Sequence, residues 1–94
     1  MGKLLILSKY VFLVFSADIN EKRKHIHITD KKGNLEKLCK YWFEPEIVLE
    51  YNYGFNEKEL NKIKKLIKDN FVTINDQLDK FFSGKPVKSI KKDQ

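Results

Sequence analysis

Apolar residues in the first part of the chain form two uninterrupted runs and then an alternating segment, which predicts β-strands. Residues 4–7 and 10–15 are the runs, and the two residues between them fit the length of a tight hairpin turn. Because the second run is apolar throughout, we expect both faces of that strand to be covered. Residues 25–29 alternate, with histidines on one face and isoleucines on the other. A fourth strand is predicted over residues 35–43, and residues 16–24 are predicted to be a mobile loop.

After Pro45 the chain carries helix signals. Residues 45–53 are expected to form a short helix, because Pro45 suits a first helical turn and Gly54 suits a left-handed stop. Asn56 followed by Glu59 is typical of a capping box and predicts the start of a second, long helix. This helix has one apolar stripe, which consists of Leu60, Ile63, Ile67, Phe71, Ile74, Leu78 and Phe81.

The length of the second helix poses a packing problem. A straight helix of about 27 residues would extend ~40 Å, which exceeds the diameter of a domain of this size. It must therefore overhang or break, and the β-branched segment 72–74 is the predicted place for a bend. An overhanging stripe would offer a surface to a protein partner or to a second copy of the chain.

Together these elements predict an α+β fold. A three- to four-stranded antiparallel sheet is followed by the short helix and the long C-terminal helix. A chain of 94 residues fits one domain with one core, here residues 1–84. Residues 85–94 are basic, lack apolar periodicity and are predicted to be a disordered tail.

The formal net charge of +6 raises the hypothesis of a basic nucleic-acid binder. Half of this charge comes from the tail, and Arg23 is the single arginine, so the bidentate fork that suits phosphates and guanine edges is nearly absent. The charge therefore supports this hypothesis only weakly.

Cysteine content and hydropathy bear on the compartment. Cys39 is the single cysteine, so the chain can form neither an internal disulfide nor a cysteine-based zinc cluster. Ser8 and Lys9 divide the apolar segment 4–15 into pieces too short to span a bilayer. We therefore expect a cytoplasmic protein without membrane association.

His25 and His27 are the first candidates for chemistry, because residues two apart on a strand share a face. Two imidazoles could bind a metal ion, contact a phosphate group, or act as general acid and base. Alternatively, they are ordinary polar residues hydrogen-bonded to neighbours. No metal or other cofactor is predicted, because the remaining ligand candidates, Asp18, Glu21, Asp30 and Glu44, have no diagnostic spacing.

Antiparallel pairing of the third and fourth strands extends the histidine face. If Tyr41 and Phe43 face the core, Lys40 and Trp42 lie beside the histidines. Such a surface would suit an anion, a nucleotide or a peptide, unless Trp42 packs beneath the short helix with Lys40 over it. Cys39 is expected on the core side as an inert thiol. The predicted ligand-binding residues are therefore His25, His27, Lys40 and Trp42.

Three motifs occur in a characteristic order: His25-Ile26-His27-Ile28, then Lys-Tyr-Trp-Phe-Glu-Pro at residues 40–45, then Gly54-Phe55-Asn56 followed by a helix that ends near Phe82. In this order the chain resembles the small bacterial domain-of-unknown-function family 4160, over residues 4–84. Members commonly have two prolines before the first histidine, where this chain has Arg23-Lys24. The resemblance implies a compact α+β fold, a role in toxin–antitoxin-type gene pairs, and no established activity.

Three functional hypotheses remain. The favoured one is a non-catalytic binding module, a component of a toxin–antitoxin-like pair, which uses the helix stripe for protein contact and the histidine face for a ligand. The second is a small nuclease-like enzyme in which His25 and His27 are acid and base or metal ligands, with Lys40 stabilising phosphate charge. The third is a nucleic-acid binder that relies on the basic tail.

Overall fold

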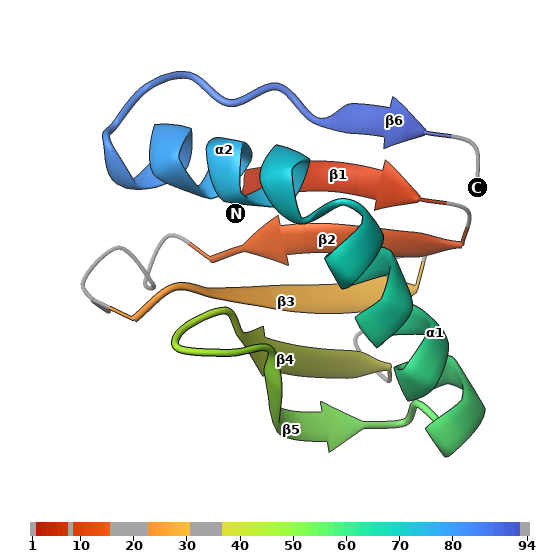
Figure 1. Cartoon of the computed structure of the whole chain (residues 1–94). Helices are drawn as coiled ribbons and strands as arrows, with labels where there is room; N and C mark the ends of the chain where they lie inside the picture. The colour runs from red at the N-terminus through yellow and green to blue at the C-terminus, as the bar shows by residue number, and fades with distance from the viewer. Residues whose placement is uncertain (1, 8, 16–22, 31–36, 93–94) are drawn as a thin grey trace.

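A computed structural model describes residues 2–7, 9–15, 23–30 and 37–92. These residues form one six-stranded sheet, in the order β5-β4-β3-β2-β1-β6, and two helices (Figure 1). Neighbouring strands are antiparallel except β1 and β6, which are parallel. The elements are β1 (Gly2–Leu7), β2 (Tyr10–Val14), β3 (His25–Asp30), β4 (Leu38–Trp42), β5 (Val48–Tyr53), α1 (Glu57–Asp69), α2 (Phe71–Phe82) and β6 (Ile90–Lys92).

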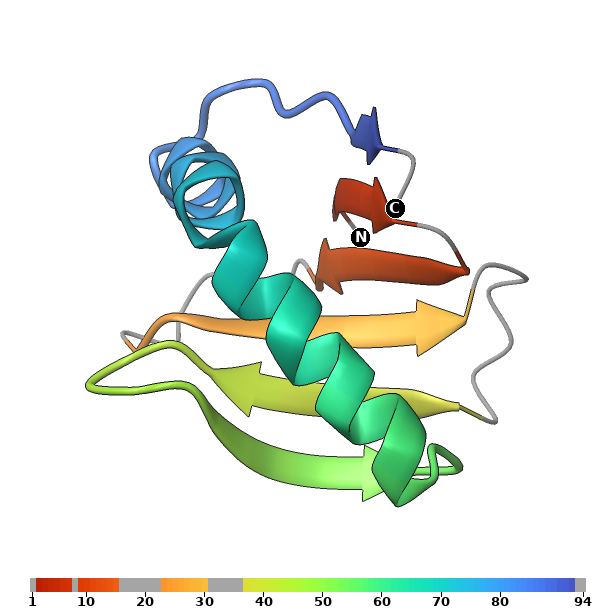
Figure 2. The same ribbon diagram turned by 45° about the vertical axis from the view of Figure 1, so that its right-hand side comes forward.

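Both helices lie on the same face of the sheet, as Figures 1 and 2 show from two directions. The sheet is larger than the predicted three to four strands, although the α+β class is confirmed. On its opposite side no helix of the described ranges covers the strands, and we call this side the helix-free face. None of the described helices is long and apolar enough to cross a membrane.

The core lies between the sheet and the two helices. Leu7 pairs with Tyr10, so the predicted hairpin is confirmed, and every residue of β2 is buried, as its apolar run indicated. Ile26 and Ile28 of β3 are fully buried on the helix side. The alternation of β3 therefore orients this strand as predicted, because burial of the isoleucines fixes which face turns to the helices.

The long helix breaks at Asn70 and does not overhang. Asn70 ends α1 and begins α2, and its backbone N–H and side-chain Nδ2 both donate to the carbonyl oxygen of Leu66, at 3.0 and 2.9 Å. The predicted bend, in the β-branched segment 72–74, lies two residues beyond this break. Asn interrupts a helix because its amide competes for backbone hydrogen bonds. The predicted start of α1 is confirmed, since Asn56 and Glu59 form a reciprocal capping box.

The predicted short helix at residues 45–53 is wrong, because the chain forms β5 there. Pro45 lies in the bend before the strand. The segment from Val48 to Tyr53 contains one β-branched residue and two tyrosines, and it pairs along the whole of β4 from Trp42 to Leu38. These ladder hydrogen bonds outweigh the helix signals of the flanking Pro45 and Gly54.

The tail contributes the sixth strand. Within residues 85–94, which were expected to be disordered, β6 pairs with β1, and Ile90 lies opposite Leu5. The Gln77 side chain connects the two segments: its Nε2 donates to the carbonyl oxygens of Leu4 at 3.0 Å and Lys88 at 2.7 Å. Gln77 is 2% exposed and lies beside the apolar stripe of α2.

The apolar stripe of the helices is not available to a partner in the folded chain. Ile63, Ile67, Ile74 and Leu78 have no exposed surface, because the sheet covers them. Leu60 and Phe81 are half-buried, and Phe71 is exposed but stacks on Phe43, with ring centroids 5.2 Å apart. The stripe therefore serves the core of this chain.

Candidate functional site

The four predicted ligand-binding residues lie together on the helix-free face. The register of β3 and β4 sets His25 opposite Trp42 and His27 opposite Lys40. The rings of His25 and Trp42 have centroids 5.6 Å apart, and those of the two histidines 5.4 Å. The Nζ atom of Lys40 lies 4.3 Å from the centre of the Trp42 indole, which is the distance of a cation–π contact.

Three further aromatic side chains continue this group across the sheet. Phe15, after β2, contacts His27 edge-on at 4.5 Å between centroids. On the other side Tyr51 of β5 lies 6.1 Å from His27, and Tyr53 lies 5.4 Å from Tyr51. We call this group the ring cluster; it consists of Phe15, His25, His27, Trp42, Tyr51 and Tyr53.

Exposure differs strongly among the rings of the ring cluster and the neighbouring Lys40, and Phe15 is half-buried. His25 is 0% exposed, His27 4% and Lys40 8%. Trp42 and Tyr51 are half-buried, and Tyr53 is 62% exposed. The accessible part of the cluster is therefore at β5, whereas the imidazoles lie beneath the surface.

The hydrogen bond of His25 determines its tautomer. Nδ1 lies 2.9 Å from the carbonyl oxygen of Arg23, and a carbonyl can only accept, so Nδ1 carries the proton. In the neutral ring Nε2 then carries no proton. This nitrogen is the one that could accept a proton or bind a metal ion. Either role requires a substrate or ligand to reach Nε2, and the full burial of His25 blocks that approach.

Arg23 and Lys24 hold the start of β3 in place. The Arg23 guanidinium lies 4.3 Å from the centre of the Trp42 ring, and its Nε donates to the carbonyl oxygen of Glu44. Lys24 Nζ lies 2.8 Å from both Asn75 Oδ1 and Asp79 Oδ1 on α2. These contacts contradict the predicted mobile loop for residues 23 and 24; residues 16–22 lie outside the described ranges.

Trp42 is the residue at which the polar contacts of this face meet. Two cations, Arg23 and Lys40, each approach its ring at 4.3 Å. Its Nε1 donates a hydrogen bond to the Glu50 carboxylate of β5. A half-buried indole with two cations and a carboxylate around it is held in one orientation, which suits a preformed recognition surface.

The remaining metal-ligand candidates do not gather around the histidines. Asp18 and Glu21 lie outside the described residues, Asp30 ends β3, and Glu44 lies in the bend after β4. In the described part of the chain, no group of three or more His, Cys, Asp or Glu side chains could hold a metal ion.

On the helix side, Cys39 and Tyr41 are buried and protonated. Burial raises the pKa of the Cys39 thiol to about 12. Burial also raises the pKa of Tyr41 to about 12, with a smaller contribution from Cys39, and its hydroxyl donates to the carbonyl oxygen of Leu60 at 3.1 Å. A thiol held neutral in the core has no nucleophilic role.

Phe15, Arg23, Tyr51 and Tyr53 also lie on this face and are not among the residues predicted from the sequence. Tyr51 and Tyr53 alternate in a segment that begins with Val48, and this alternation indicates a strand. The helix predicted for the same residues did not take it into account. Arg23 gave no signal, because its contact with Trp42 joins residues that only the sheet brings together.

Comparison with known proteins places the chain in a family. The family described as domain of unknown function (DUF4160) matches residues 10–77, most of the chain, and the chain belongs to this family. The matched range contains the whole ring cluster. No curated protein and no solved structure matches the chain.

Proposed function

We propose that this DUF4160 domain is a non-catalytic, cytoplasmic binding module that holds a protein partner along the edge of β5. The observation that carries the proposal is a difference between the two edges of the sheet. An edge strand presents unpaired backbone N–H and C=O groups, and proteins usually protect such edges by short strands, lysines or prolines.

The β6 edge has a short strand and lysines, whereas β5 has neither and carries only one register shift against β4 and one charged residue, Glu50. β6 has three residues, of which two are lysines. β5 has six residues and contains neither lysine nor proline. Val48, Leu49 and Tyr53 are 40%, 38% and 62% exposed, so apolar surface lies along this edge strand. An edge of this kind suits an added strand from another polypeptide.

Side chains beside β5 have the composition of an interface hot spot. Val48 lies opposite Trp42 and Tyr53 opposite Leu38, so a partner strand would extend the helix-free face next to the exposed end of the ring cluster. Arg23 is exposed and lies on Trp42. Trp, Tyr and Arg are the residues that contribute most of the binding energy in protein interfaces.

Burial of the imidazoles supports binding over catalysis. A nuclease-like mechanism needs His25 or His27 within hydrogen-bond reach of a substrate, and both are at most 4% exposed. In a binding module their role is to pack beneath Trp42 and Tyr51 and hold these rings in position.

In a toxin–antitoxin-like pair, the partner at β5 is the product of the adjoining gene. The test is co-expression of the two proteins, with co-purification and sedimentation as the measurements. Val48→Lys/Tyr53→Lys places two charges on the β5 edge, and Val72→Lys, which adds one charge elsewhere, is the control, because Val72 is 81% exposed on α2. We expect the partner to co-purify with the wild type and with Val72→Lys, and not with the double variant.

The same samples decide between partners. If the wild-type chain by itself sediments as a dimer and the double variant as a monomer, the β5 edge binds a second copy of the chain instead of the adjoining gene product. The proposal fails if the wild type remains a monomer with the neighbouring protein absent, or if Val72→Lys disrupts the complex as strongly as the double variant.

A further inference from the structure

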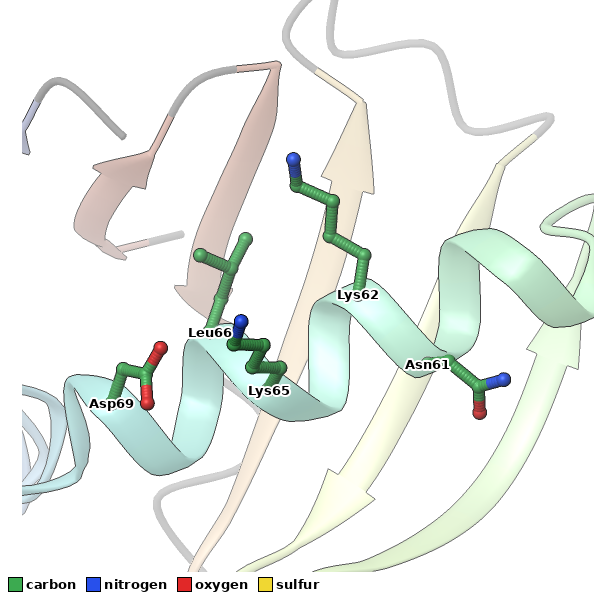
Figure 3. A pocket seen from close by; sticks show the side chains of 5 residues that line it. All are labelled: Asn61, Lys62, Lys65, Leu66 and Asp69. Carbon is green, nitrogen blue, oxygen red and sulfur yellow. The ribbon is translucent and has the colours of Figure 1, made fainter.

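A second surface, on the helix side, is lined by lysines. A cavity of about 550 Å³ between the β1–β2 turn and the start of α1 is lined by Lys9, Lys37, Lys58 and Lys62, with Glu59 the acidic residue at its wall. A second cavity of about 420 Å³ follows along α1 and is lined by Lys62, Lys65 and Asp69 among others (Figure 3). Because Lys62 lines both, we treat them as one feature, the lysine groove.

The lysines converge from three segments of the chain. Lys58, Lys62 and Lys65 lie on successive turns of α1, at spacings of four and three, and therefore share one side of the helix. Lys9 comes from the hairpin turn and Lys37 from the residue before β4. Only the sheet brings these two residues to the helix, so the sequence pattern could have revealed the three helix lysines but not Lys9 and Lys37.

The acidic residue of the first cavity is already engaged. One Glu59 oxygen lies 3.5 Å from Lys37 Nζ, and the other accepts from the backbone N–H of Asn56 at 3.2 Å. By contrast, Lys9, Lys58, Lys62 and Lys65 form no ion pair with any residue in the described ranges. Within the described ranges, these lysines outnumber the two acidic residues of the lining, Glu59 and Asp69, around a space large enough for a ligand.

The chemistry of the lining selects the ligand class. Lysine ammonium groups are point charges that attract phosphate without reading its orientation, and the groove contains no arginine. From Lys58 to Lys65 the helix advances by about 10 Å, so its lysines can contact more than one phosphate group of a bound strand. We propose that the lysine groove binds phosphate groups, as a contact site for single-stranded nucleic acid or for a nucleotide, without base specificity.

The groove differs from the site of the proposed function, because none of its lining residues belongs to β5 or to the ring cluster. It also differs from binding through the basic tail, because no groove lysine belongs to residues 85–94.

The test compares two pairs of lysines on the same helix. Lys58→Gln/Lys62→Gln removes two charges from the groove, and Lys64→Gln/Lys68→Gln removes two exposed charges at the same spacing outside its lining. Binding of a labelled single-stranded RNA of about 12 nucleotides is measured by fluorescence anisotropy across a salt series, with pyrophosphate as the competing small ligand.

We expect the groove variant to weaken RNA binding about tenfold and to reduce the salt slope by about 1.4, or 0.7 for each lost phosphate contact. The control variant should stay within about twofold of the wild type, because its lysines do not line the groove. If pyrophosphate displaces the RNA at a concentration far below that of the RNA, the groove is a site for a small phosphate ligand. Equal weakening in both variants, or no binding of either ligand by the wild type, would overturn the proposal.

Discussion

The side-chain amide of Gln77 donates a hydrogen bond to the carbonyl oxygen of Leu4 at 3.0 Å, joining α2 to β1 across most of the chain length. The same nitrogen donates to Lys88 at 2.7 Å. One buried polar group thus connects the helix layer, the first strand and the segment that leads into β6.

Gln77→Leu is expected to lower the free energy of unfolding by about 1–3 kcal/mol, because two carbonyl oxygens lose their donor while the side-chain volume is nearly conserved. Urea unfolding followed by circular dichroism measures the change. Asp76→Asn is the control, since residue 76 is exposed. A loss in Asp76→Asn as large as that in Gln77→Leu would contradict a special role for the amide.

Cys39 should make stability fall at high pH. Its pKa is about 12 in the folded chain, against 9.0 for a free thiol. Below about pH 9 both states hold the proton; between about pH 9 and 12 only the unfolded state ionises, and the free energy of unfolding falls by about 1.4 kcal/mol per pH unit. Tyr41 adds to the loss above about pH 10 by the same reasoning.

Comparison with Cys39→Ala isolates the thiol. From about pH 8 to about pH 10.5 the wild type should lose about 2 kcal/mol more than this variant in urea unfolding. Equal losses would mean that Cys39 ionises as readily in the folded chain as in the unfolded one.

Arg23→Gln tests the contact on the single tryptophan. Without the guanidinium over its ring, Trp42 should become more accessible, and acrylamide should quench its fluorescence more strongly. The loss in stability should be about 0.5–1 kcal/mol, the size of an exposed cation–π contact. Lys3→Gln removes the same charge from an exposed position on β1 and should leave quenching unchanged. Unaltered quenching in Arg23→Gln would show that the ring is already open to solvent.

His25→Ala should act mainly on stability. Its ring is fully buried against Trp42 and His27, so truncation leaves a cavity and should cost about 2–4 kcal/mol. Tyr53→Ala, at the exposed end of the same ring cluster, should cost less than about 1 kcal/mol. Thermal and urea unfolding of both variants provide the comparison. If His25→Ala is as stable as Tyr53→Ala, the His25 ring does not have this structural role, and a functional role becomes the better explanation.

Local sequence patterns predicted the features that depend on strand alternation or on contacts between neighbouring residues. The alternation in β3 was sufficient to assign its isoleucines to the core, and the reciprocal bonds of Asn56 and Glu59 form within four residues of chain. The same patterns failed at residues 48–53, where pairing with β4 outweighed local helix signals, and at Asn70, whose side chain ends a helix that the apolar stripe alone would continue.

The sequence by itself determined the α+β class, the hairpin, the orientation of β3 and the shared face of His25 and Trp42, because these depend on strand periodicity and on neighbouring strands. Tertiary structure alone decided that the imidazoles are buried, that β5 and β6 are the two edges, and that Lys9 and Lys37 meet α1 in the lysine groove. The physical reason is distance along the chain: burial, strand order and charge convergence arise from contacts between segments far apart in sequence, and periodicity within a segment carries no information about them.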